Sequence, residues 1–156
     1  QVAAARLQKQ REEGKLQKKY LALAEGDLSE ANDSVFWKEI AIPLAPDPEN
    51  PMKMTISPDG LLPGSRNAVT YYKNIKNFGN ATLVELQLET GRTHQIRVHM
   101  QYLGFPLVGD YLYNPDMEYI HRQALHSWKL SFIHPITKEP MTFSAELPED
   151  MKNILI

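Results

Sequence analysis

A strand, a glycine turn and a polar helix follow one another between residues 82 and 103, and this succession constrains the fold most. Residues 82–89 alternate apolar and polar side chains, which is typical of a strand with one buried and one wet face. Gly91 is expected to turn the chain, and a helix is predicted over residues 93–103, capped by Thr90 or Thr93. Polar residues concentrated where a strand meets a helix favour a functional site at this junction.

Two stripes of side chains run along the predicted helix. The apolar stripe consists of Ile96, Met100 and Leu103, and the polar stripe consists of His94, Arg97 and Gln101. The pattern taken alone favours a solvent-facing helix that carries an incidental arginine. A binding or catalytic site is the alternative, and the stripes do not decide between the two.

The remaining chain predicts an α+β fold, built as a single domain with a mostly antiparallel sheet and flanking helices. Strands are predicted at residues 19–24, 35–42, 52–57, 68–75, 82–89, 124–133 and 141–145, and further helices at residues 2–13 and from about Pro148. The proline-rich segment 43–51 is predicted to be a loop.

Charge and composition exclude several classes of protein. The 156 residues contain no cysteine, so disulfides and thiolate metal sites are excluded, and the spacing of the five histidines fits no zinc signature. No apolar run approaches the roughly 20 residues that span a bilayer, and a cytoplasmic location is expected. The net charge is −2, yet residues 1–20 carry six basic and two acidic side chains. This basic arm could follow a phosphate backbone, but for the arm alone a solvated helix face is the favoured explanation of the charges.

Several sequence strings occur in the order typical of one protein family. They are Lys18–Gly26, Leu88–His99, Gly104–Asp110, Arg122–His126, Phe132–Pro135 and Leu147–Met151. Together they resemble the RluA-type RNA pseudouridine synthases over essentially the whole chain. The resemblance implies the catalytic fold of that family, ribosomal or transfer RNA as partner, and isomerisation of uridine to pseudouridine without a cofactor or metal.

The resemblance also implies roles for particular residues. Arg97 matches the arginine that pairs with the catalytic aspartate, which suits the need of a buried carboxylate for a charged partner. Tyr20 matches the tyrosine that stacks on the target uracil, and it is a candidate for taking the proton from carbon 5. The positions expected to contact RNA or to form the wall of the site are Lys18, Lys19, Arg92, His94 and Gln95.

One family motif has no counterpart in the chain: an Arg-Leu-Asp run followed by Thr-Ser-Gly, which carries the nucleophile. Asp110 instead follows a glycine and is predicted to form a turn or cap. We therefore expect the chain to be the C-terminal part of a synthase catalytic domain, inactive alone and prone to self-association through exposed sheet edges. The alternatives are a non-catalytic RNA-binding or ribosome-associated protein on a degenerate synthase scaffold, and a structural partner domain without RNA contact.

Overall fold

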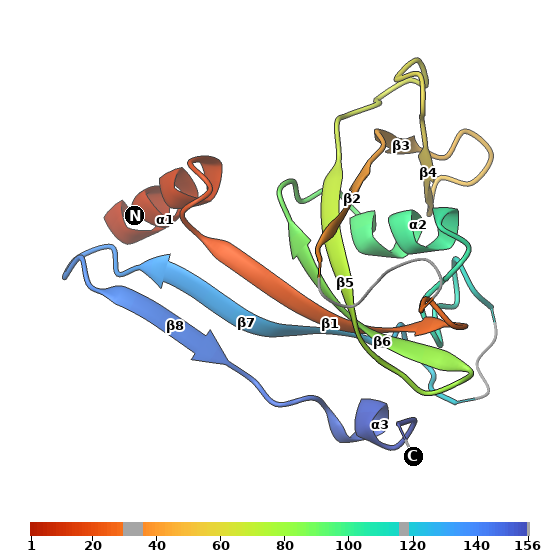
Figure 1. The fold of residues 1–156 in the computed structure, drawn as a ribbon. Helices are drawn as coiled ribbons and strands as arrows, with labels where there is room; N and C mark the ends of the chain where they lie inside the picture. Colours follow the sequence, from red (N-terminus) through yellow and green to blue (C-terminus); the bar gives the residue numbers. More distant parts are fainter. Residues whose placement is uncertain (30–35, 116–118, 156) are drawn as a thin grey trace.

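A six-stranded antiparallel sheet organises the computed structural model, which describes residues 1–29, 36–115 and 119–155. Its strand order is β2-β5-β6-β1-β7-β8 (Figure 1). The strands are β1 (Gln17–Glu25), β2 (Lys38–Ala41), β5 (Val69–Asn77), β6 (Ala81–Leu88), β7 (Leu125–Ile133) and β8 (Pro140–Ser144). A second sheet pairs β3 (Leu44–Pro46) with β4 (Met54–Ile56), and the helices are α1 (Val2–Glu12), α2 (Gln95–Tyr102) and α3 (Glu149–Lys152). The predicted α+β, mostly antiparallel fold is confirmed.

Alternation along the central strands supplies an apolar surface to both faces of the sheet. Ala22 and Leu86 belong to the cluster that Ile96 and Met100 of α2 cover. Leu23, the next residue of β1, belongs to a separate cluster that includes Met151 of α3. The sheet face that was predicted to be solvent-exposed is therefore covered over part of its length by the C-terminal segment.

The proline-rich segment contains a short strand where a loop was expected. Leu44 and Ala45 are fully buried, and the main chain of Leu44 exchanges two hydrogen bonds with Arg66, at 3.0 and 2.8 Å. Pro46 stands at the end of β3, where it costs the ladder little. Burial and pairing therefore outweigh the turn preference of the flanking prolines. Residue 35, the first of the strand expected at 35–42, lies outside the described residues.

Helix α1 is attached by its polar side chains, since none of its residues is buried. The amide of Gln10 donates to the carbonyl oxygen of Ile133 at 2.7 Å and accepts from the Ile133 N–H at 2.8 Å. Arg6 Nη1 donates to the Pro135 carbonyl at 2.8 Å. These contacts hold α1 at the end of the β7–β8 ribbon (Figure 1). In the described part of the chain, no helix is long and apolar enough to cross a membrane.

The loop after α2 is locked onto the central strand, and this places Asp110. Val108 donates to the Leu23 carbonyl at 2.9 Å and accepts from the Ala124 N–H at 2.9 Å. Gly109 has φ +73°, and a Cβ there would collide with the carbonyl oxygen of Arg122. Only glycine satisfies both constraints. The next residue is consequently fixed beside α2.

Candidate functional site

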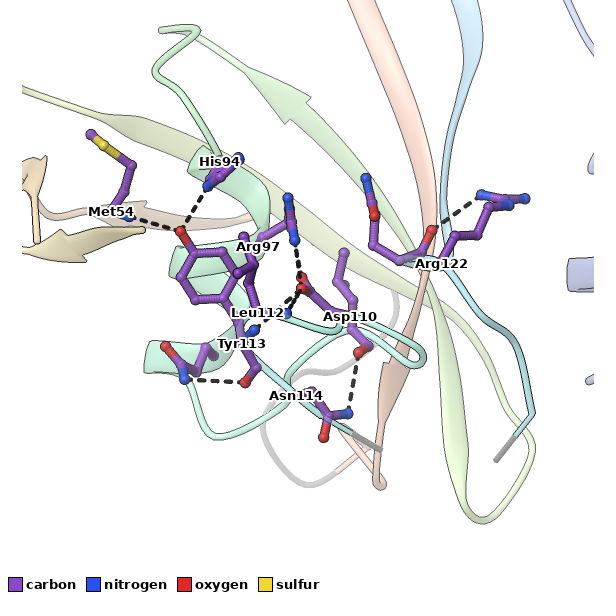
Figure 2. A network of polar contacts seen from close by, with 11 residues as sticks. Met54, His94, Arg97, Asp110, Leu112, Tyr113, Asn114 and Arg122 are labelled. Atoms are coloured by element: carbon purple, nitrogen blue, oxygen red, sulfur yellow. Dashed lines mark hydrogen bonds and ion pairs between the residues drawn. The ribbon is translucent and has the colours of Figure 1, made fainter. Parts of the chain in front are cut away.

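Helix α2 places its two stripes as the spacing predicts. Ile96 and Met100 are buried in the sheet core, and Leu103 packs against it. The polar stripe faces the loop that contains Asp110 and Tyr113: His94 and Gln101 each bond to Tyr113, and Arg97 bonds to Asp110 (Figure 2). Arg97, at the centre of the polar stripe, is therefore buried, so the solvent-facing helix with an incidental arginine that the pattern favoured is wrong at this position, although Gln101 stays exposed.

Arg97 and Asp110 form a buried, two-pronged ion pair. Nε and Nη2 of Arg97 each lie 2.7 Å from one carboxylate oxygen of Asp110. The exposed fraction is 6% for Arg97 and zero for Asp110. The hydrogen bonds to Asp110 raise the pKa of Arg97 despite burial, and the rings of Tyr111 and Tyr113 lie 5.6 and 5.1 Å from its guanidinium carbon. The guanidinium is thus charged and fixed in orientation.

Asp110 also stabilises a turn, which was one of its two predicted roles. Its Oδ1 accepts from the backbone N–H of Leu112 at 3.1 Å and of Tyr113 at 3.2 Å, in addition to Arg97. Four donors therefore surround one carboxylate that has no exposed surface. A substrate has no access to this group, so Asp110 cannot take the nucleophile's role in this conformation. Nη1 of Arg97, in contrast, has no hydrogen-bond partner among the described residues.

His94 precedes α2 in a left-handed conformation, with φ 55°. Thr90 and Thr93 were expected to cap the helix, and this is wrong: His94 occupies the cap without a side-chain cap bond. Its Nδ1 lies 2.8 Å from the Tyr113 hydroxyl, which also accepts from the Met54 N–H. Burial, and then the charge of Arg97, lower the pKa of His94. The ring is therefore neutral at pH 7 and adds no second cation beside Arg97.

Gln95 ties the strand-to-helix junction to the sheet. Its Oε1 accepts from Thr90 Oγ1 at 2.8 Å and from the Arg92 N–H at 3.0 Å. Its Nε2 donates to the Val69 carbonyl at 3.0 Å and to Thr70 Oγ1 at 2.9 Å. With an exposed fraction of 2% and all four positions engaged, Gln95 directs no hydrogen-bonding group toward a ligand. Its contribution here is to shape the junction.

His99 continues this network and has no exposed surface. Its Nε2 lies 2.9 Å from the carbonyl oxygen of Ile42, which can only accept, so Nε2 carries the proton. Thr70 accepts from Gln95 and donates to Nδ1 of His99 at 2.8 Å. Sequence analysis missed this role, and its one available signal was the four-residue spacing that puts Gln95 and His99 on one side of α2.

Tyr20 lies in a cleft of about 430 Å³ between the turn after α1 and the junction before α2. Lys18 and Arg92 line the same cleft, and Arg92 Nε donates to the Asn67 carbonyl at 2.8 Å. Burial raises the pKa of the half-buried Tyr20, so its hydroxyl stays protonated at neutral pH. Arg97 does not line this cleft. The structure thus brings Lys18, Tyr20 and Arg92 together, and separately groups His94 with Arg97.

Lys19 points to the opposite face of the sheet. Its Nζ lies 3.9 Å from Glu85 and 5.5 Å from the centre of the Trp37 ring, and Lys73 contacts the same two residues. Because neighbouring strand residues face opposite ways, Lys19 and Tyr20 cannot serve one cleft. Any contact of Lys19 with RNA would be on a different surface.

Two further histidines, His126 and His134, also make structural contacts. His126 Nε2 lies 3.0 Å from the Ala145 carbonyl, and His134 Nδ1 accepts from the N–H groups of Ile136 and Thr137. Within residues 1–29, 36–115 and 119–155, no group of three histidine, aspartate or glutamate side chains is placed to hold a metal ion.

Comparison with known proteins identifies the family of this chain. The family model described as RNA pseudouridylate synthase matches residues 1–102, which is more than half of the chain. The chain belongs to that family. It is 44% identical over 142 residues to the uncharacterized RNA pseudouridine synthase YjbO of Bacillus subtilis, covering 91% of this chain and 47% of that protein. It is also 44% identical over 119 residues to the ribosomal large subunit pseudouridine synthase D of Zymomonas mobilis, covering 70% of this chain and 37% of that protein.

The solved structure of the human RNA pseudouridylate synthase domain containing 1 is similar to the chain, with a TM-score of 0.76 and 25% identity. The match covers 99% of this chain and 62% of that one. Against three Bacillus subtilis members of the pseudouridylate synthase family, the chain spans 43–48% of their length. It thus spans about half of the curated relatives it matches.

The buried ion pair predicts a large difference between two aspartates of this family member. Asp110→Ala leaves the buried Arg97 unpaired and is expected to lower the free energy of unfolding by about 3–5 kcal/mol. Asp150→Ala is the matched control, because Asp150 forms the same bidentate ion pair with Arg122, with N–O distances of 2.7 and 2.8 Å. This pair is exposed: the exposed fraction of the side chain is 44% for Asp150 and 39% for Arg122. That loss should be about 1 kcal/mol or less. Urea unfolding measures both, and equal losses would contradict the account.

The buried neutral state of His99 predicts a loss of stability in acid. Burial lowers the pKa of His99, and the hydrogen bond to Ile42 opposes this only in part. Because the folded state disfavours the protonated ring, the stabilisation is complete above the ordinary pKa of 6.5 and is lost as the pH falls below it. Unfolding free energies measured from pH 7.5 to 5 should decline, and less steeply in His99→Gln. An identical decline in both proteins would exclude His99 as a cause.

Proposed function

We propose that the chain forms part of an RNA pseudouridine synthase that converts uridine to pseudouridine in structured ribosomal or transfer RNA. The observation that carries the proposal is the burial, charge and hydrogen bonding of the Arg97 guanidinium in a member of this family. Its guanidinium is buried and charged, with two nitrogens held by Asp110 and Nη1 without a partner in the described chain. Such a group is suited to orient a second carboxylate that must stay ionised where water is excluded.

The reaction itself explains why a carboxylate and an aromatic ring are needed. The glycosidic bond from N1 breaks, the uracil rotates, and carbon 5 bonds to the ribose while its proton leaves and N1 gains one. The atoms balance without a cofactor or an energy source. The nucleotide must leave the base stack for protein groups to reach it. An aspartate then serves as nucleophile or proton shuttle, and an aromatic ring holds the detached base.

We assign the aromatic contact to Tyr20. Its ring lies in the cleft beside Lys18 and Arg92, and base stacking on such a ring contributes about 1–3 kcal/mol per base. The raised pKa of Tyr20 disfavours the phenolate that would be needed to take a proton from carbon 5. This supports stacking over proton abstraction as the role of Tyr20.

We propose that the nucleophilic aspartate comes from a segment outside these 156 residues. No aspartate of the chain follows Arg-Leu, and Asp110 is surrounded by four donors without exposed surface. In this arrangement the incoming carboxylate bonds to Nη1 of Arg97, and Asp110 keeps the other two nitrogens. The chain alone would therefore bind RNA without isomerising uridine.

The test is release of tritium from RNA labelled at carbon 5 of uridine. We expect no release by the chain alone, and release by a longer gene product that contains an Arg-Leu-Asp segment. Replacing that aspartate with asparagine should abolish release. Turnover by the 156-residue chain would refute the external nucleophile. An inactive longer product that still binds RNA would instead favour a non-catalytic RNA-binding protein on this scaffold.

A further inference from the structure

The cleft beside Tyr20 has a marked excess of positive charge. Arg11, Lys18 and Arg92 line it against a single carboxylate, that of Glu89. Oε2 of Glu89 accepts a hydrogen bond from the Tyr71 hydroxyl at 2.9 Å, so this carboxylate is already engaged. The protein as a whole has a net charge of −2, so the cleft differs in sign from the whole molecule.

Arg11 is directed into the cleft by its surroundings. Its Nη2 lies 3.3 Å from where a Cβ on Gly91 would stand, so the absence of a side chain at Gly91 leaves room for the guanidinium. Its positive charge acts to lower the pKa of Tyr20, which places the charge near the tyrosine hydroxyl. The Arg11 side chain makes no hydrogen bond or ion pair with another residue of the described chain.

Two lysines of the basic arm outside the cleft share a carboxylate partner, whereas Arg11 and Lys18 in the cleft have none among the described residues. Lys9 and Lys15 lie 3.7 and 2.7 Å from the carboxylate of Glu13. Lys18, like Arg11, has no such partner among residues 1–29, 36–115 and 119–155. Arg11 and Lys18 thus lie where the cleft opens beside Tyr20, without a carboxylate partner in the described chain.

We propose that this cleft is a phosphate-binding site for RNA, in which Arg11 and Lys18 contact the oxygens of one phosphate and Arg92 lines the facing wall. The inference rests on the proposed function, because it takes the bound nucleotide to be the one whose base lies against Tyr20. A guanidinium matches two phosphate oxygens through parallel hydrogen bonds, and a lysine adds a point charge. The phosphate positions the nucleotide, and the ring of Tyr20 holds its base.

Salt dependence of RNA binding tests the site on the chain itself. The probe is a short single-stranded oligouridylate, and the logarithm of its binding constant is plotted against the logarithm of salt concentration. Each phosphate contact to a single strand contributes about 0.7 to the slope. The double variant Arg11→Gln, Lys18→Gln should bind more weakly, and its slope should be shallower by about 0.7. The matched control, Lys9→Gln with Lys15→Gln, removes the same charge outside the cleft and should keep the slope of the unmodified chain.

Three outcomes would overturn the phosphate site: no binding of the oligouridylate, an unchanged slope in the cleft variant, or an equal change in the control. The last would mean diffuse attraction to the basic arm. Tritium release by the longer gene product separates this result from the proposed activity. Release of tritium together with an unchanged salt-dependence slope in the cleft variant would refute the phosphate site but not the proposed activity. The shallower slope without any release would keep the site and refute the activity.

Discussion

The buried pair of Arg97 and Asp110 is the interaction on which the rest of the site depends. An isolated guanidinium in this position would cost several kcal/mol, because it has only 6% exposure. The chain meets this cost with a carboxylate that is itself anchored by two backbone N–H groups. Gly109, which tolerates no side chain, sets the position of that carboxylate against the central strand. The orientation of Arg97 is therefore determined by backbone geometry as well as by charge.

The pair of Arg97 and Asp110 has no net charge. Because Asp110 neutralises Arg97, an additional carboxylate would meet a directed hydrogen-bond donor at Nη1 rather than an excess positive charge. Specificity for such a carboxylate would come from geometry, in keeping with the fixed fork of a guanidinium. The neutral rings of His94 and His99 fit this arrangement, since neither adds a competing cation near α2.

Much of the fold could be predicted because its signals are local. The alternation of β6 and the two stripes of α2 depend on residues a few positions apart, and both elements formed where the pattern placed them. The strand at Leu44 was missed because its pairing with distant residues outweighs the proline signal. A cap at Thr90 or Thr93 was wrong because the Thr90 hydroxyl bonds to Val69 and Gln95 instead.

The site was harder to predict for the same physical reason. Asp110 lies 13 residues from Arg97, and no periodicity connects them. One signal was available: a buried arginine requires a carboxylate, and Asp110 directly follows an apolar segment that enters the core. The opposite facing of Lys19 and Tyr20 could have been read from strand alternation alone. The four bonds of Gln95 depend on tertiary contacts that its sequence neighbours do not reveal.

Asp110 holds Arg97 rigidly, while Nη1 at one edge of the guanidinium has no partner in the described chain. Nitrogen-15 NMR of the arginine side chains in this chain tests it most directly, with Arg97→Lys to assign the signal. We expect the Nε–H of Arg97 to exchange with water far more slowly than that of Arg122, whose ion pair has the same form but is exposed. Equally fast exchange at both arginines would contradict a fixed Arg97 and the site built on it.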